Sequence, residues 1–196
     1  MLSFATVHAL TECLLHVEHD TPPAPLAAAE QLGTLVLAQD QPTCPTGGPL
    51  RALRLLRLPL LGDQRRHLTL PAALHQIAAA MAADAAPDPS PDGEENGPLH
   101  PDDRAALRHA LRKPRPGLRL LAWAVCYDDL LADDEGIAPL RRVEAVDVDG
   151  RVYQLSRRPG EPRPVVLLDE QADTGDLPAT YPPLVRLATI GQPAQT

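Results

Sequence analysis

The sequence predicts an α+β protein with a helical N-terminal part and a small antiparallel β-sheet of three to four strands, flanked by helices, in the C-terminal half. Hydrophobic residues make up 44% of the 196 residues and aromatic residues only 3%. Leu, Ala and Val must therefore fill the core, which favours helices, and the 23 prolines limit helix length. Asp149-Gly150 lies between two alternating apolar runs and predicts a β-hairpin over residues 143–155.

Two helices are expected at the start of the chain. Residues 4–18 place apolar side chains at helical spacing on one face and polar ones on the other. The run Thr21-Pro22-Pro23 ends this helix. Residues 25–38 predict a second helix, because proline is tolerated in a first turn and apolar residues follow at helical spacing.

Residues 39–48 contain prolines and a Gly-Gly pair and predict a loop. Over residues 50–61, arginines at i, i+3 and i+6 favour a helix over a strand, with Pro59 ending or kinking it. Thr69 is a candidate N-cap for a further helix that runs to about residue 82.

Residues 85–101 predict a flexible linker, because this segment is rich in proline, glycine and acidic residues and has almost no apolar side chains. The linker divides the chain into a helical region, 1–84, and an α+β region, 102–191. The second region is expected to begin with a short helix over 104–112, which Asp102 caps and the prolines after it end.

The α+β region contains the expected strands. Residues 117–131 alternate around Trp123 and predict a largely buried strand. A two-residue type I′ loop at Asp149-Gly150 would place Val146 opposite Tyr153. The hairpin faces would then carry Val146, Val148, Tyr153 and Leu155 on one side, and Val143, Ala145 and Val152 on the other. Residues 165–168 add a fourth strand, residues 184–188 form a last helix, and residues 192–196 are a frayed tail.

Composition restricts the cellular compartment and the classes of binding partner that we expect. The formal net charge of −8 opposes general attraction to nucleic acid and to anionic membranes. Cys13, Cys44 and Cys126 show no CxxC spacing, which is typical of a reducing cytosol. The first residues lack a basic segment and a cleavage site, and no apolar run is long enough to span a membrane. Arginine usage and the excess of Ala, Pro and Asp point to a GC-rich bacterial genome. The sequence therefore predicts a bacterial cytoplasmic protein.

The candidate binding residues are an arginine stripe. Arg104, Arg108 and Arg112 follow one another at i, i+4 and i+8 on a predicted helix, within a block of net charge +4 over 101–120. Guanidinium groups bind carboxylates and phosphates in a bidentate manner. A second block, residues 48–67, also carries +4 from five arginines and one aspartate. Neither block has the interleaved aromatics that stack on bases, so pairing with the protein's own acids or with a partner is favoured.

The acidic residues suggest metal chemistry only weakly. Asp128 and Asp129 follow the Trp123 strand and belong to an expected acidic loop, 128–135. Strand-end carboxylates hold Mg²⁺ in many nucleases, but the usual partner lysine is missing. Asp147-x-Asp149-Gly150 resembles part of an EF-hand loop, whose first and last ligands would here be Ala145 and Ser156. We therefore expect no metal and no cofactor.

Two further groups are expected to be structural. His8, Glu12, His16 and His19 share one face of the first helix, but Cys13 points about 100° away from Glu12 at 3.6 residues per turn. They therefore predict a solvated face rather than a zinc site. Cys126, within an alternating apolar strand, is expected to be inert core.

The sequence contains no complete catalytic, metal or nucleotide motif, and no motif points to a particular family. The favoured expectation is a non-enzymatic protein that acts through protein–protein interaction, with another protein or with its own copies. One alternative is a metal-dependent hydrolase or nuclease that uses the strand-end carboxylates. The other is a nucleic-acid-binding accessory protein that uses the arginine stripe.

Overall fold

The computed structural model describes residues 1–21, 31–42, 51–62, 68–84, 97–112, 118–133, 136–169 and 177–190. These residues form four helices and one six-stranded antiparallel sheet, so the α+β class is confirmed. The helices are α1 (Phe4–Asp20), α2 (Leu70–Asp84), α3 (Pro101–Arg112) and α4 (Tyr181–Ile190). The strands are β1 (Gln31–Pro42), β2 (Arg51–Leu61), β3 (Arg119–Asp133), β4 (Gly136–Asp147), β5 (Val152–Arg157) and β6 (Val165–Asp169).

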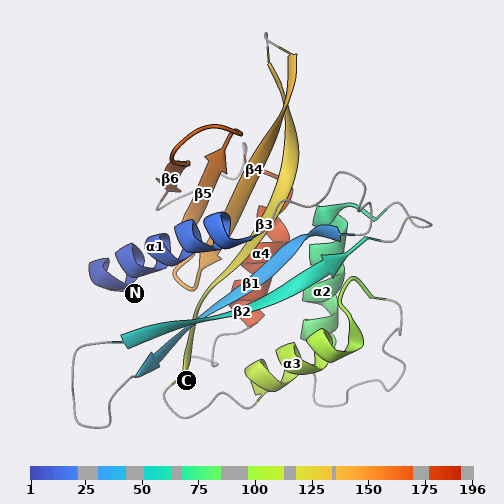
Figure 1. Cartoon of the computed structure of the whole chain (residues 1–196). Coiled ribbons are helices and arrows are strands. Elements are labelled where there is room, and N and C mark those ends of the chain that lie inside the picture. Colours follow the sequence, from blue (N-terminus) through green and yellow to red (C-terminus); the bar gives the residue numbers. More distant parts are fainter. Residues whose placement is uncertain are drawn as a thin grey trace.

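The strand order is β2-β1-β3-β4-β5-β6, so β1 pairs with both β2 and β3 (Figure 1). Both sides of the predicted linker therefore contribute strands to one sheet. Most of the linker, residues 85–96, lies outside the described residues, as does the predicted tail. The end of the linker packs inward, because Leu99 is buried and the carbonyl of Pro98 accepts from the Leu61 amide at 2.8 Å.

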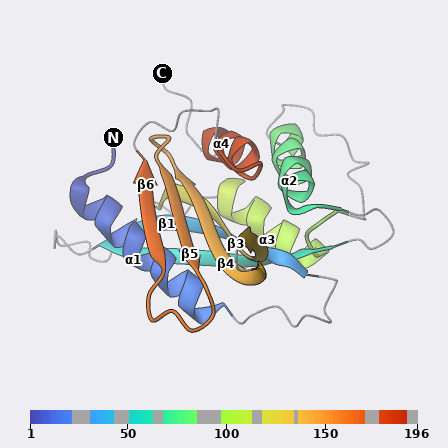
Figure 2. The same ribbon diagram turned by 90° about the horizontal axis from the view of Figure 1, so that it is seen from above.

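Helices cover both faces of the sheet (Figure 2). Helix α1 packs with Leu10, Leu14 and Val17 on one face, over small side chains that include Ala122 and Ala124. Alanines there let the helix approach the strands closely. Helices α2, α3 and α4 pack on the opposite face, around a core that contains Trp123. The two interiors are thus separated by the sheet itself.

Two predicted helices are strands in the structure. β1, residues 31–42, takes the place of the helix predicted over 25–38 and of the start of the loop predicted over 39–48. β2, residues 51–61, takes the place of the helix predicted over 50–61, so the sheet has six strands rather than three to four. Strand β1 is buried continuously from Thr34 to Asp40, because helices lie on both faces and strands pair on both sides. The apolar part of this stretch, Leu35–Ala38, is a continuous run, and such a run does not distinguish a strand from a buried helix.

Strand β2 follows a different pattern. Leu58 and Leu60 are buried, whereas Arg57, Pro59 and Leu61 are exposed. This alternation over residues 57–61 has the period of a strand, and the arginine spacing obscured it. Pro59 is tolerated because β2 is at an edge of the sheet, where a missing N–H breaks no ladder.

The hairpin at 143–155 is confirmed, but its register is not the predicted one. The Gly150 amide donates to the Asp147 carbonyl at 3.0 Å, and the Asp147 amide donates to the Arg151 carbonyl at 3.0 Å. The loop therefore has three residues and ends on Gly150 with φ of +86°. Val146 lies opposite Val152 instead of Tyr153.

This single-residue shift exchanges the hairpin faces. Tyr153 and Leu155 share the α1 face with Val143 and Ala145, whereas Val146 and Val152 face the opposite core. The predicted grouping of side chains was therefore wrong, although the strands themselves were right.

The remaining elements follow the sequence closely. The helices predicted at 4–18, 69–82 and 104–112 are α1, α2 and α3, and the last helix is longer than predicted. Ser3 caps α1, because its hydroxyl accepts from the Thr6 amide at 3.2 Å. Strand β6 is the predicted fourth strand of the second half.

Candidate functional site

A pocket of about 350 Å³ opens between α2, residues 97–99 and α3, and we call it the α2–α3 pocket. Its lining residues are Gln76, Ile77, Ala79, Ala80, Met81, Ala83, Gly97, Pro98, Leu99, Arg104 and Arg108. The volume and the mostly apolar lining with a few polar groups are typical of binding sites. The α2–α3 pocket is therefore the candidate functional site in the described part of the chain.

The alanine-rich sequence of α2 creates the hollow. Ile77 and Met81 lie one turn apart and are buried, so they form an apolar floor. Ala79, Ala80 and Ala83 are exposed at the rim of the same helix. Alanine is the best helix former and fills little space, so α2 stays helical and leaves room for a ligand's side chains.

Two of the three predicted site residues line this pocket. Arg104 and Arg108 stand one turn apart on α3 and are partly buried. The side chain of Arg112 lies outside the described residues. The arginine stripe thus brings positive charge to an apolar hollow, a combination that the sequence could not show because α2 and residues 97–99 supply the other walls.

The backbone of Gly97 lies close to the guanidinium group of Arg104. A Cβ atom at residue 97 would lie 2.1 Å from Nη2 of Arg104, far closer than atoms can approach. The missing side chain therefore lets the guanidinium lie against the backbone at the mouth of the pocket. Proline, glycine and acid content predicted a linker here, and this close approach leaves no signal in the sequence.

The first basic block lies elsewhere. Arg54 and Arg57 are on the edge strand β2 and are exposed. Arg57 lies 3.5 Å from Asp20 at the end of α1. Residues 65 and 66 lie outside the described residues. Arg57 is thus paired with an acid of its own chain.

The predicted acidic loop is part of a strand. Asp128 and Asp129 lie in β3, where Asp128 is opposite Arg141 and Asp129 is opposite Leu140 of β4. Arg141 binds Asp128 through two hydrogen bonds of 2.9 and 3.1 Å, and Arg142 Nε lies 3.0 Å from Asp129. In the described ranges, no three His, Cys, Asp or Glu side chains are grouped to hold a metal ion.

A buried carboxyl group of the hairpin lies under the start of α4. Glu144 is fully buried on β4 and accepts a hydrogen bond from the Thr180 hydroxyl. Burial raises the pKa of Glu144, although Thr180, Tyr127 and Arg142 favour its charged form. Burial and the same carboxylate also raise the pKa of Tyr127. The hydrogen bond from Thr180 joins Glu144 of β4 to the start of α4.

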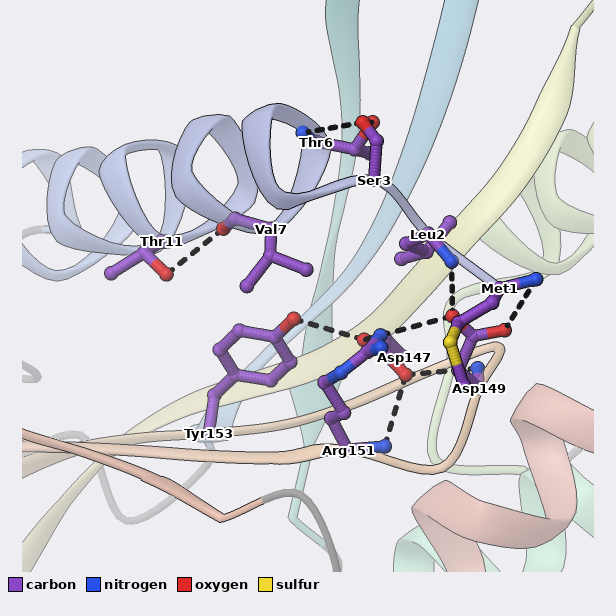
Figure 3. A network of polar contacts seen from close by, with 10 residues as sticks. All are labelled: Met1, Leu2, Ser3, Thr6, Val7, Thr11, Asp147, Asp149, Arg151 and Tyr153. Atoms are coloured by element: carbon purple, nitrogen blue, oxygen red, sulfur yellow. Dashed lines mark hydrogen bonds and ion pairs between the residues drawn. The ribbon is translucent and has the colours of Figure 1, made fainter.

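A second buried carboxylate organises the hairpin loop (Figure 3). Asp147 accepts from the amides of Asp149 and Arg151 at 2.9 and 3.0 Å, and from the Tyr153 hydroxyl at 2.9 Å. Arg151 Nη1 lies 3.2 Å from the same carboxylate. Every donor comes from the loop or β5, so Asp147 is structural. In the sequence, the close spacing of Asp147, Asp149, Gly150 and Arg151 is the feature that indicates this loop network.

The start of α1 joins this network (Figure 3). Asp149 accepts from the Leu2 amide, and its carboxylate lies 3.4 Å from the Met1 amino group. Burial acts to raise the pKa of Asp149, but the hydrogen bonds from Leu2 and Arg151 outweigh it and lower the pKa below its usual value. At the other end of α1, buried Glu18 lies 2.7 Å from Arg157 Nε. Ion pairs therefore link the residues before α1 to the hairpin loop and the end of α1 to β5.

The remaining candidates lie where the sequence placed them. His8, Glu12, His16 and His19 are exposed on α1, as predicted for a solvated face. Cys126 is buried in β3, and burial raises its pKa to about 11. Its thiolate, the reactive form, is therefore disfavoured at neutral pH.

The comparisons give no relative for this chain: no family model, no curated protein and no solved structure matches it. Among the described helices, none combines the length and apolar character needed to cross a lipid bilayer.

Proposed function

We propose that this is a non-enzymatic protein that acts by binding another protein, and that the α2–α3 pocket holds part of the partner. The observation that carries the proposal is an apolar hollow with Arg104 and Arg108 in its wall. The cytoplasmic location in a bacterium is part of the same proposal and rests on composition alone.

The pocket chemistry specifies the partner segment. A volume of about 350 Å³ admits one or two large apolar side chains but not a folded domain. Two guanidinium groups beside it favour carboxylates on the same segment. We therefore expect a short peptide segment with large apolar residues next to Asp or Glu.

The two alternatives have weaker support. Nucleic-acid binding would use the same arginines, but the net charge of −8 opposes the electrostatic attraction on which it depends. A metal-dependent hydrolase would use Asp128 and Asp129, whose carboxylates face Arg141 and Arg142. Neither alternative explains the apolar hollow.

The test uses two arrays of twelve-residue peptides that share the same leucine and phenylalanine positions. One array carries glutamates next to these positions, and the other carries lysines. The wild-type protein should bind members of the acidic array and none of the basic array, because the pocket supplies arginines.

Three variants locate the binding. Ala80→Trp fills the pocket from an exposed helix position, and Arg108→Glu reverses its charge, so both should weaken binding about tenfold or more. Arg186→Glu is the matched control, since Arg186 is exposed on α4 and is not a lining residue. Equal binding by wild type and Ala80→Trp would refute the proposal, as would no binding to either array.

A further inference from the structure

Strand β6 is an edge strand whose apolar side chains are exposed on both faces. The exposed fractions are 56% for Val165, 38% for Val166, 58% for Leu167 and 45% for Leu168. β6 ends the sheet, so its outer side pairs with no other strand among the described residues. An exposed apolar edge strand is a template for pairing with another strand.

The opposite edge strand, β2, differs from β6, because β2 is protected against pairing with another strand. Strand β2 buries Leu58 and Leu60 and exposes Arg57 and Pro59. A charge and a proline are the usual devices that prevent edge-to-edge association. Within β6 the four residues between Pro164 and Asp169 are all Val or Leu, and neither device interrupts them.

The hairpin register shows which backbone groups of β6 point outward. The Asp147 amide donates to the Arg151 carbonyl across the hairpin, so these two residues point their backbone groups at each other, and this direction alternates along an antiparallel ladder. The amides of Gln154 and Ser156 therefore point to β6, where their partners are Leu167 and Val165. The N–H and C=O groups of Val166 and Leu168 must then face away from β5.

Pro164 has the same outward parity as Val166. Its missing N–H is therefore on the outer side and costs no hydrogen bond to β5. Its carbonyl remains able to accept a bond from an added strand. The outer edge of β6 is thus competent for pairing over Pro164–Leu168.

We propose that two copies of this chain pair antiparallel through β6 about a two-fold axis at Val166, which joins their sheets. In this register Val166 meets the same residue of the second copy, and Val165 meets Leu167. Arg163 is exposed in the bend that precedes β6, so it would lie near Asp169 of the second copy at each end, and opposite charges would face each other twice. The interface is isologous, because one strand supplies both complementary surfaces.

A second copy fits β6 better than an unrelated strand, because the arginine that precedes β6 and the aspartate that ends it have opposite charges and come together when a second β6 runs antiparallel. The paired surface is one short strand, well below the roughly 1,600 Å² of a standard stable interface. Association should therefore be reversible, with a Kd on the order of 10–100 µM. The α2–α3 pocket is not part of this contact, so dimerisation and partner binding are independent.

Sedimentation velocity over about 5–500 µM tests the proposal. The wild-type protein should shift from monomer to dimer across this range. Val166→Pro removes an outward N–H while leaving the β5 ladder intact, and it should raise the Kd about tenfold or more. Val166→Thr keeps the N–H and the shape, so it is the matched control and should still dimerise.

A charge exchange tests the antiparallel arrangement and does not depend on a proline. Arg163→Asp and Asp169→Arg should each remain monomeric, because like charges then face each other at both ends. An equimolar mixture of the two should dimerise, because every facing pair is again opposite in charge. Circular dichroism and thermal unfolding should show that each variant folds as the wild type does.

Three results would overturn the proposal. The first is a wild-type protein that stays monomeric at the highest concentration. This result would overturn the proposal even if β6 bound a strand of a different protein. The second is a dimer that Val166→Pro leaves unchanged, which would place the interface elsewhere. The third is a mixture of the charge variants that remains monomeric while the wild type dimerises.

Discussion

At the scale of single residues, buried carboxylates hold the chain together. Asp147, Glu144 and Glu18 are all at most 1% exposed, and each lies at a junction between elements. Asp147 receives four donors, whereas Glu144 receives a hydroxyl from the start of α4. A buried carboxylate is stable only when it is paired or hydrogen-bonded, so these residues fix positions that apolar packing leaves free.

Tyr153→Phe tests the contribution of one donor to Asp147. The substitution keeps the buried ring and removes the hydroxyl that donates at 2.9 Å. Asp147 keeps its bonds from two amides and Arg151, so we expect a loss of about 1–2 kcal/mol in the free energy of unfolding. Urea denaturation measures it. Tyr127→Phe makes the same change of side chain on β3, and its loss of stability can be compared with that of Tyr153→Phe on β5. A change of zero for Tyr153→Phe would show that the hydroxyl is dispensable.

Glu144 makes stability depend on pH with a definite sign. Its pKa in the folded protein lies above the ordinary value of 4.5, mainly because of burial. The folded state then binds its proton more tightly than the unfolded chain does. This contribution to stability is complete below pH 4.5 and is lost as pH rises through the folded pKa. Arg142, Asp129, Tyr127 and Tyr181 are the ionisable groups that interact with it.

Glu144→Gln should remove this pH dependence, because the amide is uncharged at every pH and still accepts from Thr180. The free energy of unfolding of the variant, relative to the wild type, should rise between about pH 4 and pH 8. Urea denaturation at several pH values measures the difference. A difference that is the same at every pH would show that Glu144 titrates normally in the folded protein.

At the scale of elements, glycine decides how two strands fit. Gly33 lies at a register shift in β1 with φ of +153°, and a Cβ there would lie 2.7 Å from the carbonyl oxygen of Cys126. Gly150 ends the hairpin loop with φ of +86°, but no atom lies within 4 Å of its Cβ position. The first glycine permits close approach of β3, and the second permits only a turn.

The two glycines should respond differently to alanine. Gly150→Ala introduces backbone strain alone and should cost about 1 kcal/mol. Gly33→Ala adds a collision with the backbone of a central strand and should cost about 3 kcal/mol. Denaturant midpoints of the two variants make the comparison. Equal losses would mean that β1 can shift away from β3 without cost.

At the scale of the whole molecule, one sheet unites the two halves of the chain. Strand β1 lies between β2 and β3, so residues before and after the predicted linker share the central ladder. Trp123, the single tryptophan, is in β3 and belongs to the core that α2 and α4 cover. Its environment therefore reports on contacts from both halves.

This arrangement predicts one cooperative unfolding transition. Trp123 fluorescence reports the centre of the sheet, and far-ultraviolet circular dichroism reports all helices and strands. The two signals should have the same midpoint in urea, because β1 cannot leave the sheet without exposing Trp123. Two separate midpoints would show that the halves unfold independently.

The arginine stripe is the part of the candidate site that could be predicted from the sequence. Spacing alone placed Arg104 and Arg108 on one helical face, and both line the α2–α3 pocket. The apolar floor came from Ile77 and Met81, which are more than twenty residues away and belong to a different helix. Only the tertiary arrangement, which places α2 and α3 on the same face of the sheet, brings these groups together around one pocket.

The sequence by itself determined three of the four helices by position, the α+β class, the hairpin at Asp149-Gly150 and the presence, though not the full length, of the strands after residue 117. These follow from local periodicity and turn chemistry, which act over a few residues. The tertiary structure decided that 31–42 and 51–61 are strands, which register the hairpin takes, and where the pocket lies. A buried apolar run satisfies helix and strand equally, so the choice depends on which backbone partners are available, and for β1 those are β2 and β3.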